Sequence, residues 1–274
     1  MTPTVSGRTV VLTGAAGGLG RVIAATLVRH GARLLLVDID SAALDDLGRR
    51  VGAATVVADI ATDAGRAAIG ARLGEFAMEA DILVNNAAVE RASDFDALSD
   101  ADIRRAVDVN LLGAMLLTRA LLPGMRLRRR GHVISIASMA GVKVLPYNAL
   151  YNTTKAGLIA FSLSLGKELA GSGVSATVIC PAAVRDAGMW ARVSAQLPAN
   201  RLVQRSTITA QDVADAVLDA GRRRPPRILV ASRIVRAGAL ASAAWPRADV
   251  AMDGVSGLRR LYRRRTQTDR DNRL

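Results

Sequence analysis

Short runs of aliphatic and β-branched residues alternate along the chain with longer stretches that carry helical signals. The first run, residues 9–12, leads through a glycine-rich turn into a helix that is closed by Gly31. Ser99, followed by Asp102, predicts the capped start of a long helix that runs towards Met125. The other runs predict strands over residues 33–37, 54–58, 81–84, 132–136, 175–179 and 228–231, and helices from about 41, from about 62, and over 149–170 and 211–220.

This alternation of strands and helices predicts one parallel sheet with helices on both faces, because each parallel connection needs a crossover. The predicted fold class is α/β: a single Rossmann-like, doubly wound domain with a seven-stranded parallel sheet, over residues 1–232 of the 274. Residues 233–274 change character, with small apolar residues followed by a cluster of arginines. We expect them to form a basic C-terminal tail that is partly helical.

The cysteine and histidine content limits the chemistry that the chain can perform. Cys180 is the only cysteine, and His30 and His132 are the only histidines, so we expect no disulfide, no cysteine zinc site and no histidine-rich metal site. The first residues lack the basic patch and apolar core of a secretory signal, and no uncharged apolar run reaches membrane-spanning length. We therefore expect a cytoplasmic protein.

The formal net charge of +13 comes almost entirely from arginine, because the chain contains only three lysines. The arginines cluster, among other places at 259–265, in a way that is typical of solvated helix ends and a solvated tail. The alternative is a polyanion or membrane surface that contacts the tail, since Leu258, Leu261 and Tyr262 fall on one helical stripe amid the arginines. We do not expect nucleic-acid binding.

A glycine-rich turn follows the first predicted strand and reads Thr13-Gly14-Ala15-Ala16-Gly17-Gly18-Leu19-Gly20. Glycines let backbone amides approach a pyrophosphate, and the start of the next helix adds a partial positive charge. Asp38 ends the second strand, where a carboxylate accepts hydrogen bonds from the hydroxyls of an adenosine ribose and repels a 2′-phosphate. The pattern indicates a dinucleotide site that prefers NAD to NADP; the alternatives are a structural turn and a solvated strand-end carboxylate.

A tyrosine and a lysine one helical turn apart indicate acid–base chemistry. Tyr151 and Lys155 are four residues apart near the start of a predicted helix, so both side chains lie on one face. A neighbouring ammonium favours the phenolate, and so does the positive nicotinamide of an oxidised cofactor, so we expect the two charges to lower the pKa of Tyr151 by about two or three units. Ser138 ends the fifth strand at the ligand-binding edge of the sheet, where its hydroxyl would hold the reacting oxygen near Tyr151. Such a phenol takes a proton from an alcohol or returns it to a ketone.

Taken together, these motifs resemble the short-chain dehydrogenase/reductase family over roughly residues 6–232. The glycine turn, Asn85-Asn86-Ala87-Ala88, Ser138 and Tyr151-x-x-x-Lys155 occur in the family's order and spacing. The resemblance implies a short-chain alcohol dehydrogenase or ketoreductase that acts on CH–OH donors with NAD. The catalytic residues that it implies are Asn110, Ser138, Tyr151 and Lys155. The cofactor-binding residues that it implies are Gly14, Gly18, Leu19, Gly20, Asp38, Asp59, Ile60, Asn86, Ala87, Lys155, Pro181 and Val184.

The resemblance also assigns roles to some of these residues. Asp59 and Ile60 would flank the adenine, and Asn110 would shape the long helix and hold a water in a proton relay to Lys155. The family usually has Pro-Gly followed by a threonine, whereas this chain has Pro181-Ala182 and later Asp186. We expect Asp186 to bring a negative charge close to the nicotinamide ring. In similar proteins the long helices that correspond to those of Asn110 and Tyr151 commonly form subunit contacts, so the resemblance implies a homodimer or homotetramer.

The segment after the sixth predicted strand bears on the substrate. Met189, Trp190 and Val193 predict a short amphipathic helix, which either packs onto the core or covers an apolar substrate. We expect a small hydrophobic secondary alcohol or ketone, with Val142, Val144, Leu145 and Tyr147 as further pocket candidates. The alternatives are a 3-oxoacyl-type ketoreductase, against which Asp38 argues, a catalytically weak NAD-binding sensor, supported by Asp186 alone, and a polyanion-binding protein that uses the tail.

Overall fold

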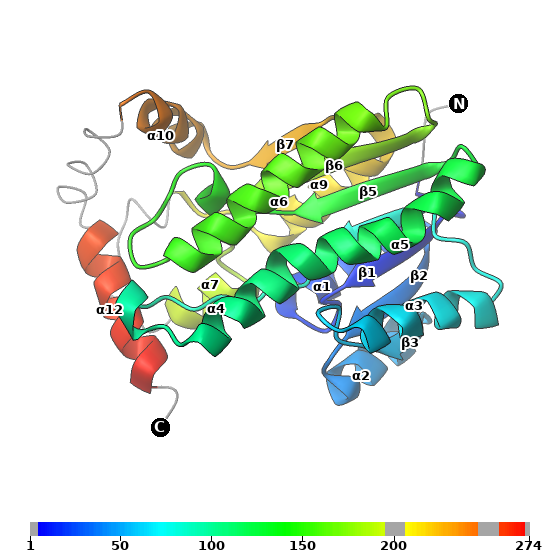
Figure 1. Ribbon diagram of the computed structural model, residues 1–274, viewed down its shortest axis with the longest axis horizontal. Helices are drawn as coiled ribbons and strands as arrows, with labels where there is room; N and C mark the ends of the chain where they lie inside the picture. Colours follow the sequence, from blue (N-terminus) through cyan, green and yellow to red (C-terminus); the bar gives the residue numbers. More distant parts are fainter. Residues whose placement is uncertain (1–4, 195–205, 246–257, 272–274) are drawn as a thin grey trace.

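The computed structural model describes residues 5–194, 206–245 and 258–271 (Figure 1). In these residues, seven parallel strands form one sheet in the order β3-β2-β1-β4-β5-β6-β7. The strands are β1 (Thr9–Thr13), β2 (Arg33–Asp38), β3 (Ala54–Val57), β4 (Ile82–Asn85), β5 (Gly131–Ile136), β6 (Val174–Pro181) and β7 (Arg227–Val230). The predicted fold class, a Rossmann-like doubly wound α/β domain with a seven-stranded parallel sheet, is confirmed.

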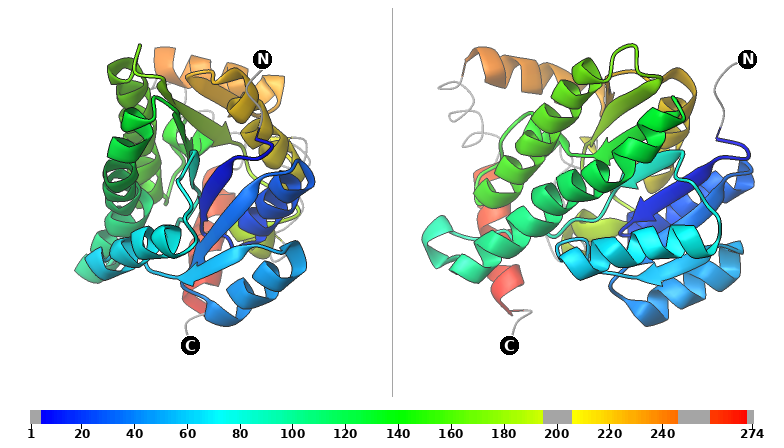
Figure 2. Two further views of the ribbon diagram at one scale, coloured as in Figure 1. Left: turned by 90° about the vertical axis from the view of Figure 1, so that its right-hand side faces the viewer. Right: turned by 45° about the vertical axis from the view of Figure 1, so that its right-hand side comes forward.

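Helices cover both faces of this sheet, as the two views of Figure 2 show. One face carries α1 (Gly18–Arg29), α2 (Ser41–Val51) and α9 (Ala210–Arg223). The other carries α3 (Asp63–Glu75), α5 (Ala114–Leu127) and α6 (Ala149–Glu168). The remaining helices are α4 (Asp100–Val107), which leads into α5, α7 (Gly188–Ser194), α10 (Arg233–Ala244) and α12 (Leu258–Asp271).

Side chains of alternate residues on each strand enter the two cores in turn. On β1, Val10 and Leu12 pack with α1, α2 and α9, whereas Val11 packs with α3, α5 and α6. All three side chains are fully buried. A strand covered on both faces has no polar side, which explains why the chain shows continuous apolar runs and no alternation of apolar and polar residues.

The long helix that the sequence predicts from Ser99 towards Met125 is not one regular α-helix. Its start is as expected, because Ser99 and Asp102 form a capping box. Between α4 and α5, however, the stretch Asp108–Gly113 is π-helical. A Cβ on Gly113 would lie 2.8 Å from the carbonyl oxygen of Ile60, so glycine permits a close approach of this turn to the chain after β3. Turns of this kind re-aim side chains and are frequent at functional sites.

The same stretch, Asp100–Leu127, is the helix among the described residues that is long and apolar enough to cross a membrane by length and composition. It contains Asp108 and Arg119, so it is not an uncharged run. Leu117 and Met125 on it are fully buried in the core beneath the sheet, and a buried core helix passes the same test. The cytoplasmic location and the homo-oligomer stay predictions.

The C-terminal tail was expected to be partly helical and solvated. It contains α10 and α12, and α12 lies beside α7 beyond the carboxyl ends of the strands (Figure 1). Tyr262, Arg265 and Thr266 on α12 are each less than 7% exposed. The inner side of α12 is therefore packed against the domain, and the expectation of a solvated tail was wrong for this helix. The boundary at residue 232 stays a prediction.

The turn between β1 and α1 depends on Gly14. Its φ of +63° lies in the left-handed region, and a Cβ there would stand 2.7 Å from the Cα atom of Ala87. We predict that Gly14→Ala lowers the free energy of unfolding by about 1–3 kcal/mol, because both the backbone strain and the clash with another backbone are unavoidable. Denaturant unfolding of the purified protein measures this change.

Gly17, three residues along, provides the matched control. Its φ is −66°, and the nearest contact of an added Cβ is the carbonyl oxygen of Gly14 at 3.4 Å. The free energy of unfolding of Gly17→Ala should therefore lie within about 0.5 kcal/mol of the wild-type value. Equal stability of the two variants would contradict the role given to Gly14.

The buried His132 on β5 makes stability depend on pH. Its Nε2 lies 2.9 Å from the hydroxyl of Thr177, and burial, reinforced by Arg224, lowers the pKa of His132 to about 3. The unfolded chain takes up a proton on this residue below its ordinary pKa near 6.5, whereas the folded chain does not. We predict that this residue costs the folded state about 1.4 kcal/mol per pH unit as the pH falls from about 6.5 towards 3.

Replacing this histidine tests the prediction. His132→Gln should remove that slope from the plot of unfolding free energy against pH, measured by urea denaturation, whatever its stability at neutral pH. His30→Gln, at an exposed position, is the control and should keep the wild-type slope. Parallel plots for the wild type and His132→Gln would refute the assignment.

Candidate active site

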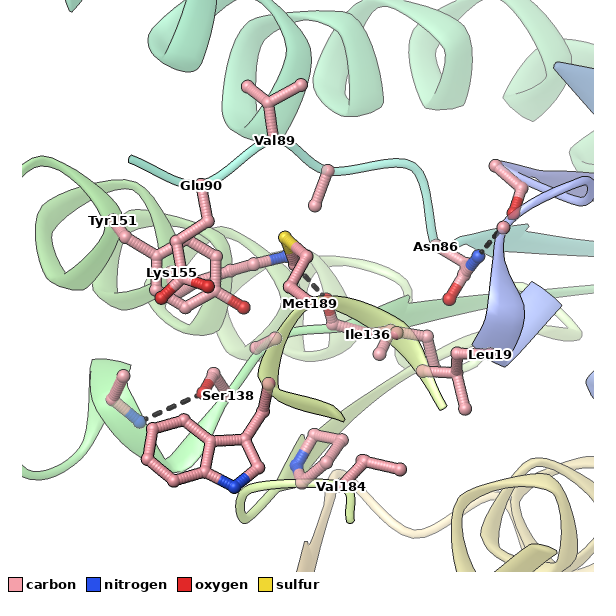
Figure 3. A pocket seen from close by; sticks show the side chains of 18 of the residues that line it. Leu19, Asn86, Val89, Glu90, Ile136, Ser138, Tyr151, Lys155, Val184 and Met189 are labelled. Atoms are coloured by element: carbon pink, nitrogen blue, oxygen red, sulfur yellow. Dashed lines mark hydrogen bonds between the residues drawn. The ribbon is translucent and has the colours of Figure 1, made fainter. Parts of the chain in front are cut away.

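A cavity of about 880 Å³ opens at the carboxyl ends of the strands (Figure 3). Its size lies within the range of ligand pockets, and its position is where open parallel sheets bind ligands. Every residue expected to bind the cofactor lines this cavity. These residues are Gly14, Gly18, Leu19, Gly20, Asp38, Asp59, Ile60, Asn86, Ala87, Lys155, Pro181 and Val184.

One end of the cavity has the features that a dinucleotide needs. Gly17 is the residue before α1 and has no side chain to cap the first N–H groups of that helix, whose first residues, Gly18 and Leu19, line the cavity. Asp38 lies half-buried beside the turn, where its Oδ2 accepts a hydrogen bond from the N–H of Ala16 at 2.8 Å. The start of α1, which favours an anion, therefore lies close to the carboxylate of Asp38, which can accept hydrogen bonds from a ribose. These residues fit a nicotinamide dinucleotide.

The middle of the cavity is held in shape by side chains that bond to backbone. Asn86 donates through Nδ2 to the carbonyl oxygens of Thr13 and Gly14, each at 3.0 Å, which joins the end of β4 to the glycine turn. Asp59 accepts from Arg105 at 2.6 Å, so this carboxylate already has a cation partner at the end of the cavity near β3. These bonds set the width of the groove before any ligand enters.

The expected catalytic side chains meet at the other end. Ser138 follows β5, where its Oγ accepts a hydrogen bond from the N–H of Ala140 at 3.0 Å, and Tyr151 lies in the first turn of α6. The ammonium of Lys155 lies 5.5 Å from the centre of the Tyr151 ring and donates to the carbonyl oxygen of Ile136 at 2.9 Å. Lys155 is only 2% exposed, so its charge is held next to the phenol without solvent around it. All three residues line the cavity.

The electrostatics of the phenol differ from the expectation. Burial raises the pKa of Tyr151 well above its ordinary value, and the carboxylate of Glu90 raises it further. The nearby Ser138 hydroxyl and the charge of Arg265 act to lower the pKa of Tyr151 but do not outweigh these effects. Burial also lowers the pKa of Lys155 to about 8. Lys155 by itself does not make the phenol acidic, because removing both groups from water outweighs their proximity. The contribution that the positive nicotinamide of an oxidised cofactor was expected to make stays a prediction.

Asn110 lies in the π-helical turn and is not among the residues that line the cavity. Its Oδ1 accepts from the N–H of Val89 at 2.7 Å and its Nδ2 donates to the Val89 carbonyl oxygen at 2.8 Å. A further bond at 3.2 Å reaches the hydroxyl of Thr154 on α6. Asn110 therefore ties the loop after β4 to α6 from within the π-helical turn; the shaping of the long helix and the water that it was expected to hold stay predictions.

Asp186 does not bring its charge to the nicotinamide end of the cavity. Its Oδ1 accepts a hydrogen bond at 2.8 Å from the N–H of Ala210, the first residue of α9. The neighbouring residues Val184 and Ala187 line the cavity, but Asp186 is not among its lining residues and is exposed. An aspartate is stabilised at a helix start, which explains its direction. The prediction that Asp186 places a negative charge beside the nicotinamide ring was wrong.

The substrate end of the cavity is mainly apolar and is covered by α7 and α12. The predicted short helix is present as α7, and its Met189 and Trp190 face the cavity, as does Leu145. The side chain of Val193 lies outside the described residues. The other candidates, Val142, Val144 and Tyr147, do not line the cavity.

Two charged residues of the site were missed by the sequence analysis. Glu90, on the loop after β4, lies beside Tyr151 (Figure 3) and pairs at 2.6 Å with Arg265 from α12. The signal for Glu90 was weak: a lone acid shortly after the Asn-Asn-Ala-Ala run, at the ligand-binding edge of the sheet. Arg265 carried no signal, because it is one of five arginines between positions 259 and 265.

Comparisons with known proteins agree with this geometry. The family model for short chain dehydrogenases matches residues 8–198. A ketoacyl reductase, HetN, from Nostoc sp. is 35% identical over 232 residues, which cover 83% of this chain and 79% of that protein.

Solved structures give the same result. The crystal structure of 3-ketoacyl-(acyl-carrier-protein) reductase from Brucella melitensis, complexed with NADH, superposes with a TM-score of 0.74 at 26% identity, over 83% of this chain and 98% of that one. A metagenomic short-chain oxidoreductase in complex with NADP superposes with a TM-score of 0.70 at 28% identity, over 82% of this chain and 97% of that one. The chain therefore belongs to the short-chain dehydrogenase/reductase family and is an oxidoreductase.

Proposed function

We propose that this protein interconverts a lipophilic secondary alcohol and its ketone, with NAD(H) as the hydride carrier. The observation that carries the proposal is the single cavity: Asp38 and the glycine turn lie at one end, and Ser138, Tyr151 and Lys155 lie together at the other. A bound dinucleotide would reach from the first group to the second. The wall beside Tyr151 is formed largely by apolar and aromatic side chains, among them Met189 and Trp190, which supports a lipophilic substrate.

The chain's own residues would handle the proton and the orientation of the substrate. The Ser138 hydroxyl would hold the substrate oxygen next to the phenol, and Tyr151 would give that oxygen a proton during reduction or take it during oxidation. Lys155, fixed by its bond to Ile136, would keep a positive charge beside the phenol and bond the nicotinamide ribose. When bound, the nicotinamide exchanges the hydride and, in its oxidised form, adds a positive charge near the site.

The raised pKa of Tyr151 is suited to the reductive direction. A phenol that keeps its proton at neutral pH is ready to donate to a ketone oxygen as the hydride arrives. In the oxidative direction the phenol has to lose that proton, and the positive ring of the oxidised cofactor favours the loss. The same residue thus serves both directions, and the charge of the cofactor biases its protonation.

Removing the phenolic hydroxyl is the direct test. We predict that Tyr151→Phe lowers kcat by about a hundredfold or more, because the proton donor is lost while the ring that fills the site remains. Turnover of NADH or NAD would be followed by absorbance with a panel of hydrophobic secondary alcohols and their ketones. Binding of NADH, measured by its fluorescence, should be almost unchanged.

Tyr147 gives a matched control, because it lies near the site in sequence but does not line the cavity. Tyr147→Phe should keep the wild-type rate. If the wild type binds NADH but turns over no alcohol or ketone in the panel, or if Tyr151→Phe keeps full activity, the proposal is wrong.

The preference for NAD over NADP rests on the surroundings of Asp38. Ala16, Gly17, Ile39 and Asp40 line the same corner of the cavity, and none of them is basic. The guanidinium of Arg21 donates to the carbonyl oxygen of Ala16, lies 3.6 Å from Asp46, and is not part of the lining.

A 2′-phosphate in this corner would therefore face a carboxylate without a cation to offset it. We predict that the wild type binds NADH at least about tenfold more tightly than NADPH, since a hydrogen bond to a charged group is worth about 1.5–3 kcal/mol. Asp38→Asn removes the charge at constant size and should reduce the preference by about tenfold, mainly by weakening NADH binding. Asp45→Asn, on the exposed side of α2, should leave both affinities unchanged. Equal binding of the two cofactors by the wild type would overturn the preference.

A 3-oxoacyl thioester is the second candidate substrate, because HetN and the Brucella enzyme are both ketoacyl reductases by name. It needs the same proton transfer at a ketone oxygen, so adding 3-oxoacyl thioesters to the panel separates the two candidates. The sensor alternative loses its support, because Asp186 bonds to α9 and lies outside the cavity.

A further inference from the structure

An ion pair between distant parts of the chain lies at the substrate end of the cavity. The guanidinium of Arg265 on α12 is 2.6 Å from Oε2 of Glu90, and the two side chains are only 4% and 9% exposed. The other carboxylate oxygen, Oε1, accepts from Nδ2 of Asn148 at 2.7 Å. Both carboxylate oxygens of Glu90 therefore have a bonding partner, and these two bonds hold the carboxylate in place.

Arg265 also belongs to a small aromatic cluster, formed with Trp190 and Tyr262. Its Cζ atom lies 6.0 Å from the centre of the Trp190 ring and 5.8 Å from that of Tyr262. The two rings are 6.1 Å apart. Trp190 comes from α7 and Tyr262 from α12, so the cluster joins these helices, and all three side chains line the cavity.

Electrostatics show how near this pair is to the reacting groups. The carboxylate of Glu90 raises the pKa of both Tyr151 and Lys155, and the guanidinium of Arg265 lowers that of Tyr151. Tyr262 on α12 also raises the pKa of Tyr151, and both Tyr262 and Arg265 line the same cavity as Tyr151, so α12 forms part of the wall of that cavity.

We propose that Glu90 and Arg265 are positioning residues that hold α12 as a wall of the substrate pocket, so that Tyr262 and Arg265 help to select the substrate. The part about selection rests on the function proposed above, whereas the part about α12 does not. A buried charge that loses its partner is strongly destabilising, so removal of Arg265 should release α12. The glycine turn and Asp38 lie at the other end of the cavity and should be unaffected.

Trp190 provides a readout that needs no substrate. The chain has two tryptophans, and Trp245 is 68% exposed, so Trp245→Phe leaves Trp190 as the reporter of the contact with α12. In this background, Arg265→Gln should shift the emission of Trp190 to longer wavelength and increase its quenching by acrylamide. Arg265→Lys, which keeps the charge, should restore most of the wild-type signal. Arg263→Gln, at an exposed position on the same helix, should change nothing.

Kinetics then test the role in selection. Arg265→Gln should raise KM for the hydrophobic substrate so that kcat/KM falls by at least about tenfold, while the affinity for NADH stays unchanged. If Arg265→Gln does not fold, Glu90→Gln/Arg265→Gln, which leaves no buried charge unpaired, replaces it in both measurements.

An unchanged Trp190 signal in the neutral variants would overturn the proposal, and so would a released α12 with an unchanged KM. A wild type that binds NADH but has no turnover would contradict the proposed function alone, because the fluorescence still decides whether the ion pair holds α12.

Discussion

The parallel direction of all strands in the sheet is the constraint on which the site depends. Because the strands point the same way, the loops that follow β1, β4, β5 and β6 open on one edge. The glycine turn, Asn86 and Ser138 come from the first three of these loops and Pro181 ends β6, and they line one cavity although more than 160 residues separate the first from the last. The sheet therefore brings these segments close together, and hydrogen bonds such as those from Asn86 to the glycine turn fix their exact positions.

The second physical constraint is the burial of ionisable groups at the substrate end of the cavity. Tyr151, Lys155, Glu90 and Arg265 line the same cavity in a place with little solvent, so the charges of Glu90 and Arg265 act on the phenol. Desolvation favours the neutral form of each group, which explains a phenol that keeps its proton and a lysine with a pKa of about 8. In the ion pair of Glu90 and Arg265, by contrast, each buried charged group has a partner of opposite charge at hydrogen-bond distance.

Much of the fold could be predicted from the sequence because its signals are local. An apolar run such as 9–12, a glycine at the end of a helix and the Ser99–Asp102 capping box each act over a few residues. The residues around the cofactor cavity were also predictable, since their motifs follow strands directly. The π-helical turn at Asp108–Gly113 was not, because it depends on the approach of Gly113 to Ile60, a contact between segments about 50 residues apart that no local pattern records.

The role of α12 escaped prediction for a different reason. Five arginines between 259 and 265 suggest a solvated surface, and an arginine that will be buried looks no different in sequence from its neighbours. What distinguishes Arg265 is its partner, Glu90, which lies 175 positions earlier in the chain. Tyr262 and Arg265 are three apart and so share one face of α12, whereas Arg263 and Arg264 are exposed. Helical geometry thus explains how a strongly basic segment presents one buried face to the site and keeps other arginines in solvent.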